Sequence, residues 1–195
     1  MPHIANRGPN KIYQFKFDEN TGHITPNSPP KVEPTEYLGP RHFCFHPTLD
    51  TVYFSDEQGC SVTGYRLDAG SGTLTAFQTI STLPAEYSGT NSCSQIQMTP
   101  NGKFLYAPNR GHNSIAGFSV DPSNGSLTAA GHVETQAVPR AFSLDPQGKF
   151  VYAAGLETGN LTSYVVDQST GELAPSEIYP VGNKPMWVLT TELGG

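Results

Sequence analysis

Short runs in which apolar and polar residues alternate recur along the chain, and four of these runs align with one another without gaps. They start at equivalent positions, which are Ile12, Val62, Ile115 and Leu161. Each run ends in an Asp that is followed four residues later by a Gly, as in Asp18 and Gly22. Alternation with a period of two predicts half-buried strands, and the Asp and Gly predict the hairpin turn that joins two of them.

A second pattern precedes three of these hairpins and has the form of a strand, a turn containing Pro and another strand. Its copies run from Phe45 to Phe54, from Met98 to Ala107 and from Leu144 to Ala153. Together the two patterns predict four antiparallel strands in each repeat of roughly 50 residues, which is the blade of an all-β propeller. A β-sandwich is the main alternative, but copies without gaps argue against it. The repeated Tyr53, Tyr106 and Tyr152 are expected in the core between blades, as is Trp187.

The repeats predict a single partial propeller domain over residues 1–195, with about four blades. Its expected pieces are an incomplete blade (1–38), three blades (39–91, 92–137 and 138–183) and the innermost strand of a next blade (184–195). Two architectures follow: the last strand closes a four-bladed ring with the first three strands, or the chain is an open arc cut from a larger ring. We favour the arc, because blade packing is normally tuned to one blade number and no tighter taper is evident.

Composition and charge argue against several classes of function. The formal net charge of -6 and the lack of any basic run argue against a grip on nucleic acid. The apolar stretches are far shorter than a membrane span and no signal pattern opens the chain, so a soluble, cytoplasmic protein is expected. The three cysteines lack C-x-x-C spacing, and the histidines are scattered, which predicts free thiols and no metal site.

Aligning the repeats exposes unusual residues near the start of the innermost strands, where a propeller lines its central channel. The equivalent positions hold Arg41, Ser94, Arg140 and Met186. Guanidinium groups offer a planar fork of donors for carboxylate or phosphate, so two arginines at such positions favour an anion site. The alternative is an ion pair between blades.

A second equivalent set lies at the turn between the second and third strands: Arg7, Glu57, Arg110 and Leu156. Glu57 can reach the same end of the channel as Arg41, and a carboxylate among arginines would stay ionised and could act as a base. His42 follows Arg41 directly, and consecutive strand residues face opposite sides, so a packing or hydrogen-bonding role weighs against a catalytic one.

The segment Gly39-Pro-Arg-His-Phe-x-Phe-His-Pro47, with Glu57, Asn109-Arg110, Pro139-Arg140-x-Phe142 and Pro185-Met-Trp187, resembles the lactonase family of seven-bladed propellers. This family includes bacterial 6-phosphogluconolactonases and carboxy-muconate cyclases. The resemblance covers nearly the whole chain, corresponds to the C-terminal half or more of a family member, and implies an arc of a seven-bladed ring.

The resemblance implies hydrolysis of an anionic sugar lactone, most naturally 6-phosphoglucono-lactone, without a metal or cofactor. Glu57, Arg41 and His42 are then the expected catalytic residues, and Arg140 and Arg110 the expected substrate-binding residues. Two alternatives stay open: a cyclase that forms a muconate lactone, and a non-catalytic propeller fragment or binding module. Exposed blade edges would in addition allow self-association.

Overall fold

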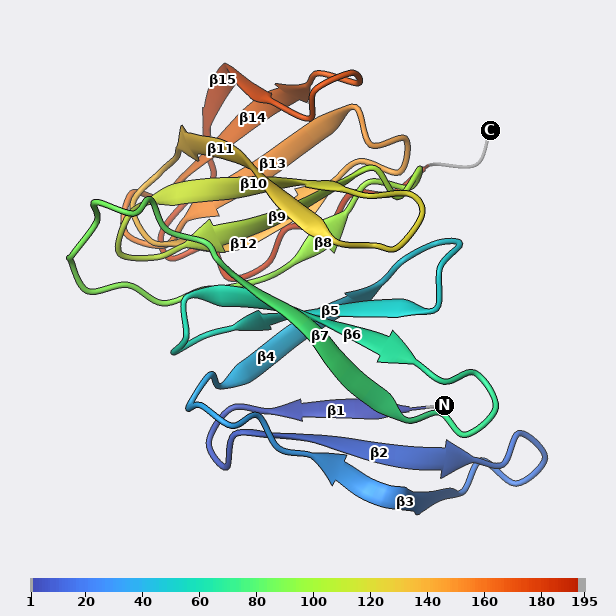
Figure 1. The fold of residues 1–195 in the computed structure, drawn as a ribbon. Coiled ribbons are helices and arrows are strands. Elements are labelled where there is room, and N and C mark those ends of the chain that lie inside the picture. The colour runs from blue at the N-terminus through green and yellow to red at the C-terminus, as the bar shows by residue number, and fades with distance from the viewer. Residues whose placement is uncertain (1, 193–195) are drawn as a thin grey trace.

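The computed structural model describes residues 2–192, and β-strands are the regular secondary structure of that range (Figure 1). The strands are β1 (His3–Asn6), β2 (Lys11–Phe17), β3 (Ile24–Val32), β4 (Pro40–Phe45), β5 (Thr51–Asp56), β6 (Ser61–Leu67), β7 (Leu74–Ser81), β8 (Gln97–Met98), β9 (Phe104–Asn109), β10 (Ser114–Val120), β11 (Leu127–Glu134), β12 (Pro139–Leu144), β13 (Phe150–Gly155), β14 (Asn160–Val166) and β15 (Leu173–Pro180). Across residues 2–192 there is no helix long and apolar enough to cross a membrane.

These strands form four antiparallel sheets in which spatial order follows chain order: β1–β3, β4–β7, β8–β11 and β12–β15. Figure 1 shows the sheets stacked one after another from the blue N-terminal sheet to the red C-terminal one. The ranges 1–38, 39–91, 92–137 and 138–183 each contain the strands of one sheet. Met1 and residues 193–195, which the ranges 1–38 and 184–195 include, lie outside the described residues.

The architecture is an open, partial propeller, which confirms the prediction of an open arc. The first sheet has only β1, β2 and β3, and β1 pairs with β2 alone. A closed four-bladed ring would need a C-terminal strand beside β1, and none of the described residues supplies one.

The C-terminal segment differs from its expected form as an innermost strand. Residues 184–192 contain no strand, and their link to the last sheet is Thr190, whose Oγ1 lies 2.8 Å from Ser143 Oγ and donates to the Leu144 carbonyl. A strand is held by backbone hydrogen bonds to a neighbouring strand, and no described strand offers them here. Trp187 accordingly has no blade to pack against and is 66% exposed rather than in the core.

The hydrophobic core lies between neighbouring blades. One cluster joins Tyr53 and Val62 to Leu105 and Phe118, so it fills the space between the second and third sheets. Corresponding clusters separate the first from the second sheet and the third from the fourth. Neighbouring sheets bury their apolar faces against one another. This burial fixes the positions of the inner strands, and with them the channel.

Hydrogen bonds repeat across these blade interfaces. The hydroxyls of Tyr53 and Tyr106, both fully buried, donate to the turn carbonyls of Gly125 and Gly171 in the next blade at 2.6 and 2.7 Å. The prediction of core positions is confirmed for these two tyrosines, but Tyr152 is only partly buried and belongs to none of the core clusters. His3 occupies the equivalent place in β1, and its Nε2 lies 3.1 Å from the Gly72 carbonyl.

The last sheet carries exposed apolar side chains, including Phe150, Val165, Ile178 and Tyr179 at 40 to 59% exposure. Such a surface suits contact with more protein. Self-association through it stays a prediction.

Candidate active site

Two arginines enter the site from β-bulges, each of which is one extra residue in an innermost strand. Pro40 pairs with Asp56 and His42 with Ser55, which leaves Arg41 without a partner in the ladder. The last sheet repeats the arrangement around Arg140, between Pro139 and Ala141. A bulge bends its strand and redirects a side chain, and bulges are frequent beside active sites. The equivalence read from the repeats therefore corresponds to a shared backbone device.

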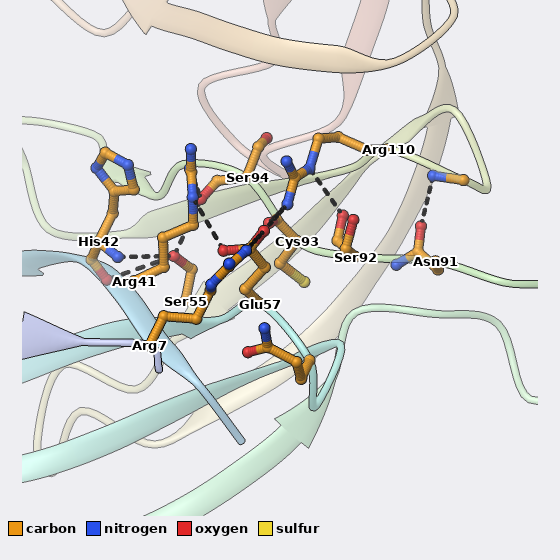
Figure 2. A network of polar contacts seen from close by, with 12 residues as sticks. Arg7, Arg41, His42, Ser55, Glu57, Asn91, Ser92, Cys93, Ser94 and Arg110 are labelled. Carbon is orange, nitrogen blue, oxygen red and sulfur yellow. Dashed lines mark hydrogen bonds and ion pairs between the residues drawn. The ribbon is translucent and has the colours of Figure 1, made fainter. Parts of the chain in front are cut away.

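Glu57 lies in the turn between β5 and β6, and three arginine side chains form ion pairs with its carboxylate. Its Oε1 lies 2.9 Å from Arg7 Nη1 and also accepts from Arg110 Nη2, while its Oε2 lies 3.3 Å from Arg41 Nε. The Glu57 side chain is only 7% exposed. Figure 2 shows these side chains converging on the carboxylate. The three arginines come from three different blades, so the carboxylate ties the inner ends of those blades together.

Backbone carbonyls hold two of the arginines in place. Arg41 Nη1 donates to the Ser94 carbonyl at 2.6 Å, and Arg110 Nη2 donates to the Cys93 carbonyl at 2.9 Å. The Cys93 amide in turn donates to the Glu57 carbonyl at 3.2 Å. Because the guanidinium groups are already held in place, they need little reorganisation when a ligand binds.

The arginines and Glu57 line a cavity of about 340 Å³ that is open to solvent. Its lining consists of the charged residues Arg7, Arg41, Glu57, Arg110 and Arg140, with Ala5 and Pro40 beside them. Four guanidinium groups around one carboxylate leave the cavity strongly positive in an acidic protein. Arg140 makes no ion pair with any residue from 2 to 192, so its donors remain available to a ligand.

The charges shift the ionisation of the site. Burial by itself raises the pKa of Glu57, but the hydrogen bond and charge of Arg110, followed by Arg7 and Arg41, outweigh it and hold that pKa below its usual value. Burial, and then the charge of Arg110, lowers the pKa of Arg41. Glu57 is therefore ionised at neutral pH.

His42 lies beside this group but outside the cavity lining. Simple strand alternation predicted that Arg41 and His42 face opposite sides; Figure 2 shows both side chains leaving β4 toward the same side, because the bulge at Arg41 interrupts the alternation. Burial, reinforced by the charge of Arg41, lowers the pKa of His42 to about 4, so the imidazole is neutral at pH 7.

Two features of the site go beyond the expected catalytic and substrate-binding residues. Arg7 completes the ring of cations, and its membership of the same repeat position as Glu57 and Arg110 was the available signal. Val138 precedes Pro139 with φ +56°, an unusual conformation for a β-branched residue, and its amide donates to Asn113 Oδ1 at 2.9 Å. The repeat alignment was the available signal, because the equivalent residue before Pro40 is Gly39, with φ +68°.

Residues 2–192 bring no three His, Cys, Asp or Glu side chains together in a way that could hold a metal ion. The donor set of the cavity is cationic, which suits an anion.

Comparison with known proteins identifies a family and several relatives that this chain resembles. The family described as "Lactonase, 7-bladed beta-propeller" matches residues 3–190. A 6-phosphogluconolactonase of Pectobacterium carotovorum subsp. carotovorum is 38% identical over 168 residues, which cover 86% of this chain and 51% of that protein.

Solved structures agree with this assignment. A protein from Lactobacillus plantarum superposes with a TM-score of 0.88 at 27% identity, over 95% of this chain and 53% of its own. A periplasmic gluconolactonase of Pseudomonas aeruginosa gives 0.86 at 25% identity, over 93% and 51%. The chain thus spans about half the length of these relatives. With the match over residues 3–190, it belongs to the lactonase family of seven-bladed β-propellers.

Proposed function

We propose that this protein hydrolyses a sugar lactone, and that the substrate is 6-phosphoglucono-lactone, which yields 6-phosphogluconate. The observation that carries the proposal is the cavity in which Arg7, Arg41, Arg110 and Arg140 surround Glu57. A phosphate monoester carries roughly 1.5 to 2 negative charges at pH 7, and a positive cavity attracts it. The names of the curated relative and of the Pseudomonas structure support lactone hydrolysis.

In this proposal the role of each arginine follows from the partners that its side chain already has. Arg140, which has no ion-pair partner within residues 2–192, binds the phosphate together with Arg110. Arg41 retains donors beyond those used on Glu57 and the Ser94 carbonyl, and these stabilise the oxyanion that forms when water attacks the lactone carbonyl.

Glu57 accepts a proton from the attacking water, and the ring C–O bond then breaks as Glu57 returns that proton to the ring oxygen. Its lowered pKa makes Glu57 a weak base, because general-base catalysis is most effective when the pKa lies near the working pH. Lactones open slowly in water without a catalyst, so modest assistance is sufficient. His42, neutral at pH 7, assists as a hydrogen-bonding partner.

The reaction uses water, and the proposed mechanism requires neither metal nor cofactor. The proposal places the protein in the cytoplasm, with a small anionic sugar lactone as its partner.

The test measures hydrolysis of freshly generated 6-phosphoglucono-1,5-lactone by the purified chain, corrected for spontaneous opening. Glu57→Gln removes the proposed base, and Glu19→Gln, an exposed turn residue, is the matched control. We expect turnover in wild type and Glu19→Gln and a loss of about 100-fold or more in Glu57→Gln. Glucono-1,5-lactone, which lacks the phosphate, should show a higher KM than the phosphorylated substrate.

Hydrolysis by wild type that persists unchanged in Glu57→Gln would remove Glu57 from the mechanism. Absence of any rate above background in wild type would contradict hydrolysis by this chain.

A further inference from the structure

Two cysteines replace the residues that the other repeats carry at one junction between blades. Cys60 lies in the β5–β6 turn with φ +49°, and the equivalent residues all share a positive φ. They are Asn10 at 55°, Asn113 at 55° and Gly159 at 66°. Asn and Gly tolerate this left-handed conformation, whereas it is uncommon for other residues. Cys60 therefore occupies a position to which its backbone preference is poorly suited.

The second replacement lies opposite the first. Cys93 aligns with Pro40, Pro139 and Pro185, the prolines that open the other inner strands. At the first junction Asn10 Oδ1 accepts a hydrogen bond at 2.8 Å from the Gly39 amide, next to Pro40. At the third, Asn113 Oδ1 accepts one at 2.9 Å from the Val138 amide, next to Pro139. The second junction has thus exchanged for cysteine both the Asn of this contact and the Pro that follows its amide donor.

The surrounding polar side chains bring the two cysteines together. Thr82 Oγ1 donates to the Cys60 carbonyl at 2.9 Å and lies 3.1 Å from Cys93 Sγ. Asn91 Nδ2 lies 3.3 Å from Cys60 Sγ and donates to Asn109 Oδ1, which is 3.7 Å from Cys93 Sγ. Both cysteines are free thiols in the reduced protein.

The pair has the asymmetry of an attacking and a resolving thiol. Cys60 is partly exposed, and Cys93 is buried. The neighbouring Cys93 side chain, aided by Asn91 and Arg110, lowers the pKa of Cys60 despite its partial burial, while the pKa of Cys93 is raised by Cys60 and by burial. The thiolate is the form that reacts with peroxides. Cys44, whose pKa burial raises, is the unreactive third thiol.

We propose that Cys60 and Cys93 form a modification site, a reversible disulfide made when the protein meets a peroxide. The Cys60 thiol first releases its proton, and the thiolate attacks H2O2 to give a sulfenic acid and hydroxide; the hydroxide takes up a proton equivalent to the one that Cys60 released and becomes water. The Cys93 thiol then attacks the sulfenic sulfur and forms the disulfide, and water leaves. Overall two thiols are oxidised by two electrons, and one peroxide is reduced to two waters.

The disulfide would act on the cavity through the backbone of Cys93. Its carbonyl accepts from Arg110 Nη2 at 2.9 Å, and its amide donates to the Glu57 carbonyl at 3.2 Å. A movement of Cys93 toward Cys60 therefore moves the support of the guanidinium that contacts Glu57. Displacements of about 1 Å in such a site can lower turnover by as much as about 100-fold.

The test treats the full chain with one equivalent of H2O2, blocks the remaining thiols with N-ethylmaleimide and measures intact mass and peptide maps. Two of the three thiols should become resistant to alkylation, in a peptide pair that links Cys60 to Cys93, and dithiothreitol should restore them. Cys44→Ala should behave as wild type. Cys60→Asn, which restores the residue found at two equivalent positions, should form no disulfide and remain folded by circular dichroism.

Three alkylatable thiols after peroxide, a disulfide that involves Cys44, or a Cys60 sulfinic acid with Cys93 still free would each overturn the proposal. These readouts do not depend on the proposed activity. In the same samples, lactone turnover should fall about tenfold on oxidation and return on reduction. An equal rate in both states would overturn the coupling to Arg110.

Discussion

Replacing Glu57 by Gln removes the charge that holds three arginines together, while the shape of the side chain is kept. Arg41 and Arg110 are 17% and 13% exposed, whereas Arg7 is 55% exposed. Removing one partner of a buried ion pair costs about 3 to 5 kcal/mol, and an exposed pair is worth less than about 1 kcal/mol. Because the Gln oxygen still accepts a hydrogen bond, we expect the lower end, about 3 kcal/mol of unfolding free energy.

This destabilisation can be measured by urea unfolding followed by circular dichroism at pH 7. A loss of about 3 kcal/mol corresponds to a fall in Tm of roughly 6 to 12 °C for a domain of this size. The matched control is Arg7→Gln, which breaks only the exposed contact and should cost less than about 1 kcal/mol. Added inorganic phosphate should stabilise Glu57→Gln more than wild type, since an anion can replace the lost carboxylate.

A cost below about 1 kcal/mol for Glu57→Gln would refute the reasoning, because the arginines would then tolerate one another without the carboxylate. An equal cost for Glu57→Gln and Arg7→Gln would equally contradict the division between buried and exposed contacts.

Three further changes test other parts of the molecule. Arg140→Met should raise KM for the phosphorylated lactone by about 10- to 100-fold with kcat nearly unchanged, as expected for loss of a charge-assisted hydrogen bond; a loss confined to kcat would contradict phosphate binding. Tyr106→Phe should lower stability to urea by about 1 to 3 kcal/mol because the Gly171 carbonyl loses its donor. The hydroxyl of Tyr152 has no hydrogen-bond partner within residues 2–192, so Tyr152→Phe should change the stability to urea by less than about 0.5 kcal/mol. Equal losses of stability in Tyr106→Phe and Tyr152→Phe would disprove the role of the interblade hydrogen bond. The pKa of His42 is lowered from 6.5 to about 4, so stability is full above pH 6.5 and falls as pH drops toward 4; His42→Gln should show a weaker dependence over that window, and identical profiles would contradict it.

The fold could be predicted from the sequence because its unit is local and repeated. An Asp followed by a Gly, alternating strands and a recurrent Tyr all act within a blade or against the next one, so one repeat informs the others. The segment at 184–192 was beyond this reasoning: its sequence matches an inner strand, but a strand also requires a neighbour, which sequence similarity does not supply. Trp187 is exposed for the same reason.

The grouping of Arg41, Glu57, Arg110 and Arg140 followed from repeat alignment, because equivalent positions in successive blades surround one channel. Their catalytic roles stay proposals. The direction of His42 could not be predicted, because a single extra residue in the ladder reverses the alternation on which the prediction rested. The proximity of Cys60 and Cys93 was equally hidden, since the two residues lie in different blades and only the hydrogen bonds of the polar side chains around them reveal it.

The bulges have a consequence for how such a protein can change. Arg41 and Arg140 are supernumerary in their ladders, and their neighbours on either side carry the strand pairing. The same slot holds Ser94 in the blade between them. A substitution at such a position changes what the cavity presents to a solute and leaves the strand ladder paired. Its cost to folding is confined to the contacts of the side chain itself, such as those of Arg41 with Glu57 and the Ser94 carbonyl. Arg140 has no ion pair among residues 2–192, so of the two positions it can change at the lower cost.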